Sequence, residues 1–165
     1  MDQCEECGFI YDLNDAPAAS GSVRSRIAEV VALLRRRDAD LLTRRSPEVW
    51  SPLEYGCHLR DVLLVQRERV LAARRTDRLE IAPMGRDERV EHDGYAQQDP
   101  QDVARQLTDA AQLFAGVLDR LGDEDWAREV VYPYPEPTGR SLKWVALHTV
   151  HEAQHHLADI RSQLG

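Results

Sequence analysis

The stretch RSLKWVALHTVHEAQHHLADIRSQLG, residues 140–165, constrains the fold of this chain more than any other segment. Its apolar residues recur at steps of three and four, which places them on one face of a long α-helix. They are Ala146, Leu147, Val150, Ala153, Leu157, Ile160 and Leu164. A helix with such a face must bury it, so the rest of the chain is expected to supply elements that pack against it.

Four of the six histidines lie in this stretch. Because an α-helix turns by about 100° per residue, five side chains share a narrow stripe at the edge of the apolar face. They are Trp144, His148, His151, His155 and Asp159. His151 and His155, four residues apart, can place two ring nitrogens on one divalent ion. The alternative is a pair of ordinary polar residues at a helix edge, so a metal site requires a further ligand from another segment.

The string from His151 to His155 also satisfies H-E-x-x-H, the zinc-protease motif in which the glutamate is the general base. Those enzymes take their third ligand from downstream, where Asp159 is the one remaining candidate in this sequence. We therefore interpret the match as accidental. Glu152 and His156 point well away from the stripe on the helical wheel, which separates them from the other three histidines.

A second helix begins with the string SPLE at residues 51–54, which combines an N-cap serine, a proline in the first turn and a capping-box glutamate. His58 lies at the edge of its apolar side and is a candidate ligand. Cys57 points about 100° away from His58, so the two are not expected to hold one ion.

The remaining segments predict two more helices and two connections. A first helix is expected over about residues 22–45, and a third from Asp99-Pro100 to a stop at Gly122. Residues 77–98 have no clear periodicity and are expected to form a long connection. Three prolines exclude a helix in the segment before Arg140, which is expected to be an extended crossover. The sequence therefore predicts an all-α fold, a four-helix bundle with one long crossover connection.

Composition limits the classes of protein to which this chain can belong. With 165 residues, 42% of them hydrophobic and 30% charged, the chain is sufficient for one globular domain, expected over residues 20–165. No apolar run approaches the ~20 residues of a membrane span, and the acidic start lacks the features of a secretory signal. The net charge of -8 disfavours a nucleic-acid-binding surface. We therefore expect a cytoplasmic protein with neither nucleic acid nor a membrane as a partner.

Residues 1–19 are expected to be irregular and contain a Cys4-x-x-Cys7 turn. This turn resembles half of a zinc knuckle or a redox pair. The third cysteine of the chain is Cys57, and an odd count does not suggest a disulfide scaffold. His92 or a second subunit could complete a zinc site at the turn. A solvent-facing turn without a metal is the preferred interpretation.

His58, His151 and His155 together offer three neutral nitrogen ligands from two helices that face each other in a bundle. Three protein ligands, with the remaining positions left to water or substrate, are typical of a catalytic zinc ion. Two alternatives remain open. His148 could be a fourth ligand that closes the site, which would weaken the case for an enzyme, or the histidines could bind no metal.

Three segments together resemble the DinB/YfiT-like superfamily: WSPLEYGCHLRDV, the helix capped by Asp99-Pro100, and LHTVHEAQHHLADI. Within it, the chain is similar to the branch related to the N-terminal domain of mycothiol-dependent maleylpyruvate isomerases. In this family one histidine comes from the second helix and two, spaced HxxxH, come from the fourth. Carried onto this sequence, these are His58, His151 and His155, the residues that the helical geometry also selects.

The resemblance implies a helical bundle, commonly a homodimer, that holds a divalent ion such as zinc or nickel. Several members of the family are transferases or isomerases that use a low-molecular-weight thiol (mycothiol, bacillithiol or glutathione). A metal with an open position can bind such a thiol as the thiolate nucleophile. We therefore expect a metal-dependent enzyme that acts with a thiol on a small electrophilic substrate. The alternative is a non-catalytic metal-binding or stress-related bundle protein.

Overall fold

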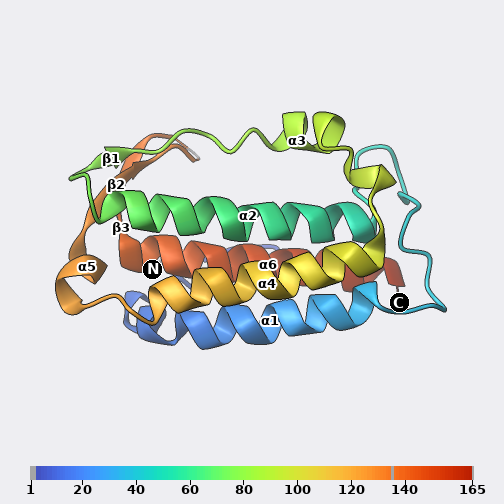
Figure 1. The fold of residues 1–165 in the computed structure, drawn as a ribbon, viewed down its shortest axis with the longest axis horizontal. Coiled ribbons are helices and arrows are strands. Elements are labelled where there is room, and N and C mark those ends of the chain that lie inside the picture. The colour runs from blue at the N-terminus through green and yellow to red at the C-terminus, as the bar shows by residue number, and fades with distance from the viewer. Residues whose placement is uncertain (1–2, 135, 165) are drawn as a thin grey trace.

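The computed structural model describes residues 3–134 and 136–164, and four long helices dominate it (Figure 1). The long helices are α1 (Ala19–Leu34), α2 (Pro52–Ala73), α4 (Pro100–Leu118) and α6 (Leu142–Leu164). The shorter helical segments are η1 (Leu13–Ala18), α3 (Arg86–His92), η2 (Tyr95–Gln97) and α5 (Asp123–Ala127). The strands are β1 (Leu79–Glu80), β2 (Glu129–Tyr132) and β3 (Thr138–Ser141).

Each long helix packs mainly against two others. α1 and α2 both contact α4 and α6, so that α1 and α2 lie diagonally across the bundle. α1 and α6 run in one direction and α2 and α4 in the other, and the chain between α2 and α4 therefore returns along the whole length of the bundle (Figure 1). This connection contains β1, α3 and η2. The predicted four-helix bundle with one long crossover is confirmed.

A small sheet at one end of the bundle corrects the all-α prediction. β1 pairs in parallel with β2, and β2 pairs in antiparallel fashion with β3. The segment before Arg140 is extended, as its prolines required, but it folds as a hairpin rather than as a plain crossover. Val130 and Tyr132 alternate with more exposed neighbours and are buried beneath the sheet, which explains why these residues form a strand.

The predicted end of the first helix was wrong. α1 begins at Ala19 and ends at Leu34, not near residue 45. After it, the carboxylate of Asp40 accepts hydrogen bonds from the backbone amides of Leu42 and Thr43, which fixes a turn in place of a further helical turn. The segment 1–19 is likewise not irregular throughout, because η1 occupies its C-terminal part and leads directly into α1.

The other predicted ends agree better with the structure. Asp99 caps α4 through the amides of Gln101 and Asp102, and α4 ends at Leu118. Gly122, the expected stop, precedes the short helix α5. The last helix begins two residues after Arg140, which belongs to β3. None of the helices in the described part of the chain combines the length and the apolar character that a membrane-crossing segment needs.

Glu54 fixes the start of α2. The Ser51 hydroxyl accepts a bond from the Glu54 amide, and the Glu54 carboxylate accepts one from the Ser51 amide. The same carboxylate is 1% exposed and accepts two bonds from Arg44, at 2.8 and 2.5 Å. Burial alone would raise the pKa of Glu54, but the bonds from Arg44 and Ser51 outweigh burial and lower it.

Glu54→Gln is expected to lower the free energy of unfolding at pH 7 by about 1–3 kcal/mol, the usual contribution of hydrogen bonds to a charged group. Because folding lowers the pKa of Glu54, its stabilisation is present above the unfolded pKa of about 4.3 and is lost as the pH falls below it. Urea denaturation at pH 7 and pH 3 would measure both effects. Glu48→Gln is the control, since Glu48 is exposed nearby. A difference between Glu54→Gln and wild type that stays constant with pH would contradict the assignment.

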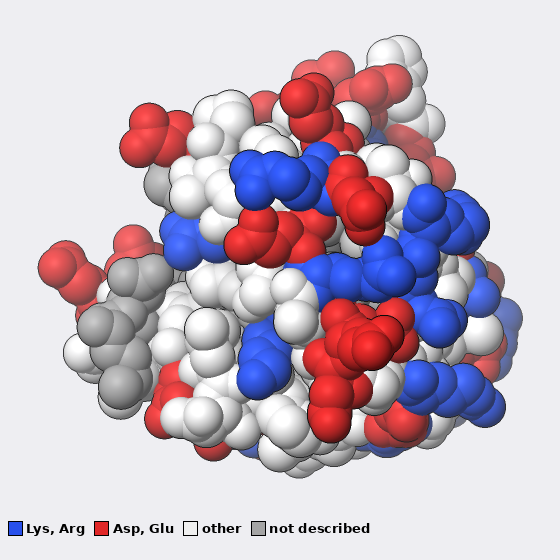
Figure 2. All heavy atoms as spheres, turned by 90° about the vertical axis from the view of Figure 1, so that its left-hand side faces the viewer, with Lys and Arg blue, Asp and Glu red and all other residues white. Residues whose placement is uncertain are grey.

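Charges of both signs are mixed at the end of the bundle that carries α5 and the sheet (Figure 2). Three ion pairs connect segments there: Arg74–Asp125, Arg78–Glu129 and Arg128–Asp77. Neither sign dominates this face, so it does not form the basic stripe that a nucleic-acid surface requires.

Candidate metal centre

His58 lies inside the bundle, where it meets two side chains of α6. It is 3% exposed, and its Nε2 lies 3.5 Å from a carboxylate oxygen of Glu152. The same oxygen lies 3.6 Å from Nε2 of His156, and the rings of His58 and His156 have centroids 5.0 Å apart. One donor atom from each of the three residues falls within 4.8 Å of the others. His58, the ligand predicted on the second helix, therefore lies with Glu152 and His156. These are the two residues that the helical wheel had separated from the predicted ligands of the last helix.

His151 and His155 lie in a different group. Their ring nitrogens lie with the sulfurs of Cys4 and Cys7, again within 4.8 Å of one another. Among the described residues, no set of donor atoms this compact contains His58 together with His151 or His155. The three predicted ligands are therefore divided between two clusters, which we call the interhelix cluster (His58, Glu152 and His156) and the cysteine cluster (Cys4, Cys7, His151 and His155).

In the interhelix cluster, Asp159 orients His156. Its carboxylate lies 2.8 Å from Nδ1 of His156, so Nδ1 donates and Nε2 is left to face Glu152. Burial alone would lower the pKa of His156, but Asp159 and Glu152 outweigh burial and raise it to about 9. A carboxylate behind an imidazole in this way is the usual support of a metal-ligating histidine.

Glu152 supplies the negative charge of the interhelix cluster. Burial alone would raise its pKa, but hydrogen bonding to His156 and His58 holds the pKa well below its ordinary value. Burial lowers the pKa of His58, which keeps that imidazole neutral at pH 7. Two imidazoles and one carboxylate are the ligand set of hydrolytic zinc sites that keep an open position. The donor set of this cluster therefore suits a divalent metal ion.

Aromatic rings line the interhelix cluster. The Trp50 ring lies 5.2 Å from the ring of His58, and the Tyr55 ring lies 5.1 Å from that of His156, between centroids. Arg86, on the long connection, stacks over Trp50 at 5.5 Å. Tyr55 and Arg86 of the connection over residues 77–98 therefore lie close to the site. The Glu152 side chain keeps 22% of its surface accessible, so the cluster can be reached from solvent.

His148, considered as a possible fourth ligand, is a member of neither cluster but lies close to one residue of each. It forms a further compact group with His151 and Glu152, and its Nε2 lies 3.9 Å from the Glu152 carboxylate. Burial lowers the pKa of His148 to about 4. Its ring stacks on Trp144 at 4.7 Å, and its Nδ1 lies 3.0 Å from the Tyr11 hydroxyl. These contacts are those of a neutral histidine packed in the core.

Two residues of the interhelix cluster, Glu152 and His156, were not chosen from the sequence as metal ligands. Glu152 and His156 are also four residues apart, as His151 and His155 are, so the last helix contains two interleaved ligand pairs. The H-E-x-x-H match was interpreted as accidental, yet its glutamate faces His58. Cys57, in contrast, faces Tyr95 and stays outside the described clusters, as expected.

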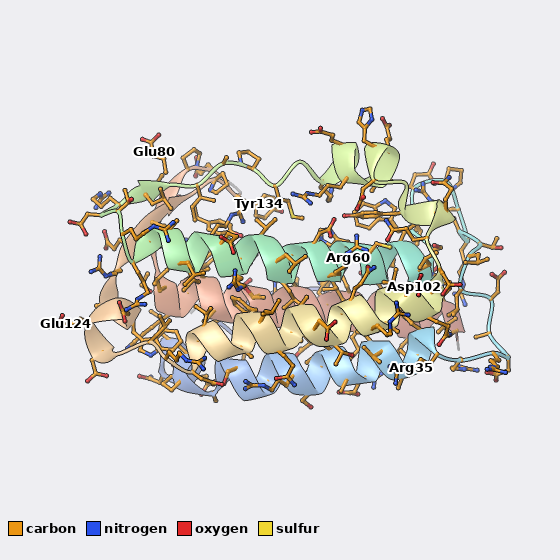
Figure 3. All side chains as sticks on the ribbon, viewed as in Figure 1. Arg35, Arg60, Glu80, Asp102, Glu124 and Tyr134 are labelled. Atoms are coloured by element: carbon orange, nitrogen blue, oxygen red, sulfur yellow. The ribbon has the colours of Figure 1, made fainter. Side chains whose placement is uncertain are left out.

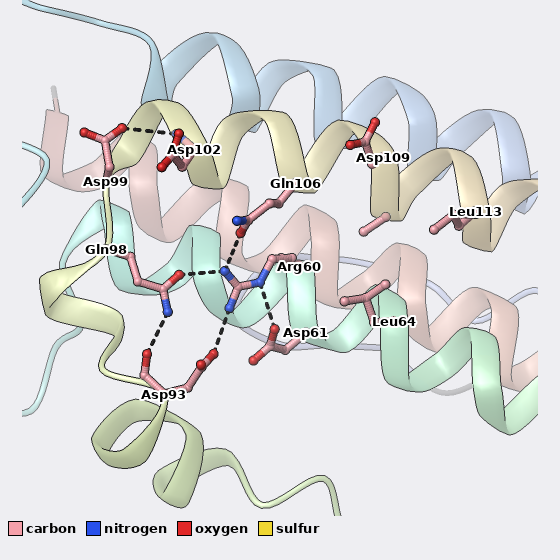
Figure 4. Close-up of a pocket in the computed structure, with 11 residues that line it drawn as sticks. Arg60, Asp61, Leu64, Asp93, Gln98, Asp99, Asp102, Gln106, Asp109 and Leu113 are labelled. Carbon is pink, nitrogen blue, oxygen red and sulfur yellow. Dashed lines mark hydrogen bonds and ion pairs between the residues drawn. The ribbon is translucent and has the colours of Figure 1, made fainter.

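A groove of about 660 Å³ lies between α2 and α4, away from the histidines (Figure 4). Arg60 and Asp102 extend from these helices on the same side of the bundle (Figure 3). Four side chains hold the Arg60 guanidinium: Asp61, Asp93, Gln98 and Gln106. Because its polar groups bind one another, this groove has the character of a structural network. The converging donor atoms around Glu152 are the better candidate for chemistry.

Comparisons with known proteins agree with the fold. The DinB superfamily model matches residues 22–160. Among solved structures, YfiT from Bacillus subtilis, described as a probable metal-dependent hydrolase with an unusual four-helix bundle topology, superposes with a TM-score of 0.75 at 18% identity. The match covers 92% of this chain and 85% of YfiT. Among curated proteins, none matches the sequence significantly. Since the family model spans most of the chain, this protein belongs to the DinB superfamily.

Proposed function

We propose that this protein is a divalent-metal-dependent enzyme whose reaction takes place at the interhelix cluster. The observation that carries the proposal is the convergence of His58, Glu152 and His156 from two helices, with donor atoms within 4.8 Å of one another. A purely structural role for a partly buried carboxylate between two imidazoles is less favourable, because withdrawing such groups from water costs free energy that apolar residues would not cost.

The cluster would hold the ion with three protein ligands. A divalent ion with an open position supplies a Lewis acid that activates a nucleophile by lowering its pKa. Asp159 keeps the His156 ring in position, and His58 needs no deprotonation to act as a ligand. His156 must lose its proton, so metal binding at this cluster should release protons. Trp50 and Tyr55 provide an apolar wall that limits the access of water to one side.

Hydrolysis is the first candidate reaction, with water as the nucleophile. It is supported by the likeness of the ligand set to that of hydrolytic zinc sites, and YfiT is described as a probable metal-dependent hydrolase. Transfer or isomerisation through a low-molecular-weight thiol such as mycothiol is the second candidate, supported by the sequence resemblance. Both reactions use the same step, in which the ion stabilises the deprotonated nucleophile. Zinc and nickel are the ions proposed, and a homodimer is the proposed assembly.

The test compares metal-loaded wild type with His58→Ala and Glu152→Gln. Panels of activated esters, amides and phosphoesters would measure hydrolysis. Consumption of 1-chloro-2,4-dinitrobenzene with mycothiol, bacillithiol or glutathione would measure thiol transfer. Both variants are expected to fall to the rate of the metal-free protein, because each removes a ligand.

Asp109→Asn is the control, since Asp109 is an exposed carboxylate on α4 away from the cluster. It should keep the wild-type rate. Activity that is unchanged in His58→Ala and Glu152→Gln would place the reaction elsewhere. Metal binding at the cluster without turnover in either panel would favour the non-catalytic metal-binding protein.

A further inference from the structure

The cysteine cluster joins the N-terminal turn to α6 and is not part of the proposed catalytic centre. Its four donor atoms, two sulfurs and two ring nitrogens, lie within 4.8 Å of one another. All four side chains are partly buried. We propose that Cys4, Cys7, His151 and His155 hold a structural zinc ion that fastens the N-terminal segment to α6.

The backbone of the N-terminal turn is shaped to present both thiols together. The amide of Gly8 donates to the carbonyl of Cys4 at 2.9 Å, and the amide of Cys4 donates to the carbonyl of Phe9 at 2.9 Å. Gly8 has a φ of 72°, a conformation that glycine adopts without strain. Gln3 and Ile10 then pair across the turn. A closed turn of this kind around Cys-x-x-Cys holds two sulfurs at a fixed separation, as a metal requires.

The distance between Cys4 and His155 suits two ligands of one zinc ion. The Cys4 sulfur lies 3.7 Å from Nδ1 of His155. Zn–S and Zn–N bonds of about 2.3 and 2.0–2.1 Å, at a tetrahedral angle, separate sulfur and nitrogen by about 3.6 Å. Nε2 of His155 lies 3.2 Å from the carboxylate of Glu6. Glu6 can thus accept a hydrogen bond from the protonated Nε2 of His155. In that tautomer Nδ1 carries the lone pair, which is directed toward the side of the Cys4 sulfur.

His151 has one ring nitrogen with a partner and one without. Its Nδ1 lies 2.8 Å from the Tyr11 hydroxyl. Its Nε2 is buried and has no hydrogen-bond partner among the residues that the structure describes. A buried polar atom without a partner is rare and costly in a protein. A metal ion at the cysteine cluster would satisfy this atom, and Tyr11 would fix the orientation of the ring.

The donor set specifies the class of metal and its role. Two thiolates and two imidazoles, spaced Cys-x-x-Cys and His-x-x-x-His, form the tetrahedral set of structural zinc sites. Four protein ligands leave no position for a substrate. The cysteine cluster is therefore closed, whereas the interhelix cluster, with three ligands, is open.

A zinc ion there would secure the first residues of the described chain. This segment also contacts α6 through the rings of Phe9 on His151 and Tyr11 on Trp144, with centroids 5.4 and 5.7 Å apart, and through the Cys7 carbonyl, which accepts a bond from Gln154. Without the ion, the segment would be held by these contacts and the Tyr11 hydroxyl. Backbone amides over residues 3–11 should then exchange with solvent much faster.

Cobalt substitution of untagged protein, purified under reducing conditions, tests the proposal. Wild type should bind cobalt with the near-ultraviolet absorption of thiolate-to-cobalt charge transfer. Cys4→Ser combined with Cys7→Ser should lose this absorption and one equivalent of zinc per chain, and should show faster hydrogen exchange over residues 3–11. Cys57→Ala and His58→Ala are the controls, and both should keep the thiolate absorption. The His58 control separates this proposal from the proposed enzyme site.

X-ray absorption of zinc-loaded His58→Ala protein measures the ligands directly, because zinc is then expected at the cysteine cluster alone. It should find two sulfurs at about 2.3 Å and two nitrogens at about 2.0–2.1 Å around one zinc ion. The proposal is wrong if the double serine variant keeps all its zinc, or if the cobalt protein lacks thiolate absorption. A disulfide between Cys4 and Cys7 that forms when the reductant is removed in the presence of zinc would overturn it as well and would indicate a redox pair.

Discussion

Replacing Asp61 with alanine is expected to lower the free energy of unfolding by about 3–5 kcal/mol, as removal of one partner of a buried ion pair does. The Asp61 side chain is 6% exposed and accepts a bond from Nε of Arg60, whose side chain is 8% exposed, at 2.9 Å. It also accepts a bond from the hydroxyl of Tyr95 at 2.6 Å and from Arg89 at 3.3 Å. In Asp61→Ala, the Arg60 guanidinium and the buried Tyr95 hydroxyl both lose the carboxylate that accepts their hydrogen bonds.

Asp93→Ala is the matched control for Asp61→Ala. Asp93 also binds Arg60, at 3.1 Å, but its side chain is 55% exposed. Exposed ion pairs contribute about 0–1 kcal/mol, so this variant should lose little. Urea denaturation followed by circular dichroism at neutral pH would measure both. Equal losses for the two variants would show that burial does not decide the strength of this network.

Asp159→Asn is expected to weaken metal binding at the interhelix cluster by about 10–100-fold, the usual effect of removing the group that orients a ligating histidine. The variant leaves the three proposed ligands in place. It removes the carboxylate that accepts from Nδ1 of His156 at 2.8 Å, and so releases the ring from its fixed orientation. The affected quantity is the metal dissociation constant rather than the number of sites.

The affinity is best measured by chelator competition in the Cys4→Ser and Cys7→Ser background, where the cysteine cluster cannot bind. Asp109→Asn in the same background is the control and should keep the affinity of the parent. The circular dichroism of Asp159→Asn should remain that of a helical bundle. An affinity unchanged from the parent would mean that Asp159 is only a surface charge and that His156 does not depend on it.

Much of the fold could be predicted from the sequence because it depends on local signals. The capping box of Ser51 and Glu54 and the Asp99 cap were found correctly, since each consists of residues three or fewer positions apart. The end of α1 was missed because leucines continue beyond Leu34 at helical spacing. In the structure both residues belong to a loop, in which Leu41 is buried and Leu42 is 58% exposed. Periodicity alone could not distinguish these loop leucines from the apolar face of a helix.

The candidate site was predicted only in part because it depends on helix rotation. A helical wheel shows that Glu152 and His156 share one side of α6 and His151 and His155 another. It does not show which side turns toward α2, because that is decided by how the apolar faces of four helices pack together. His58 was correctly placed at the border of a buried face, but its partners on α6 required the three-dimensional packing.

The short strands and the N-terminal turn illustrate a second limit. β1 contains two residues, and its partner β2 lies about fifty positions later, so no local pattern predicts their pairing. The second ligand pair for Cys4 and Cys7 could not be identified from the sequence either, because it is also distant in the chain. Its partners on α6 are 147 to 151 positions away in the chain, and no spacing rule covers such a distance.

The wide separation of Cys4 and His155, 151 positions apart in the chain, also determines when the cysteine cluster can form during synthesis. Domains tend to fold as units, and elements made early must wait for partners made late. A nascent chain has neither complete cluster until synthesis has passed His156, although the Cys-x-x-Cys turn is among the first residues made. Until then its thiols and His58 are exposed to any metal or oxidant that the nascent chain meets.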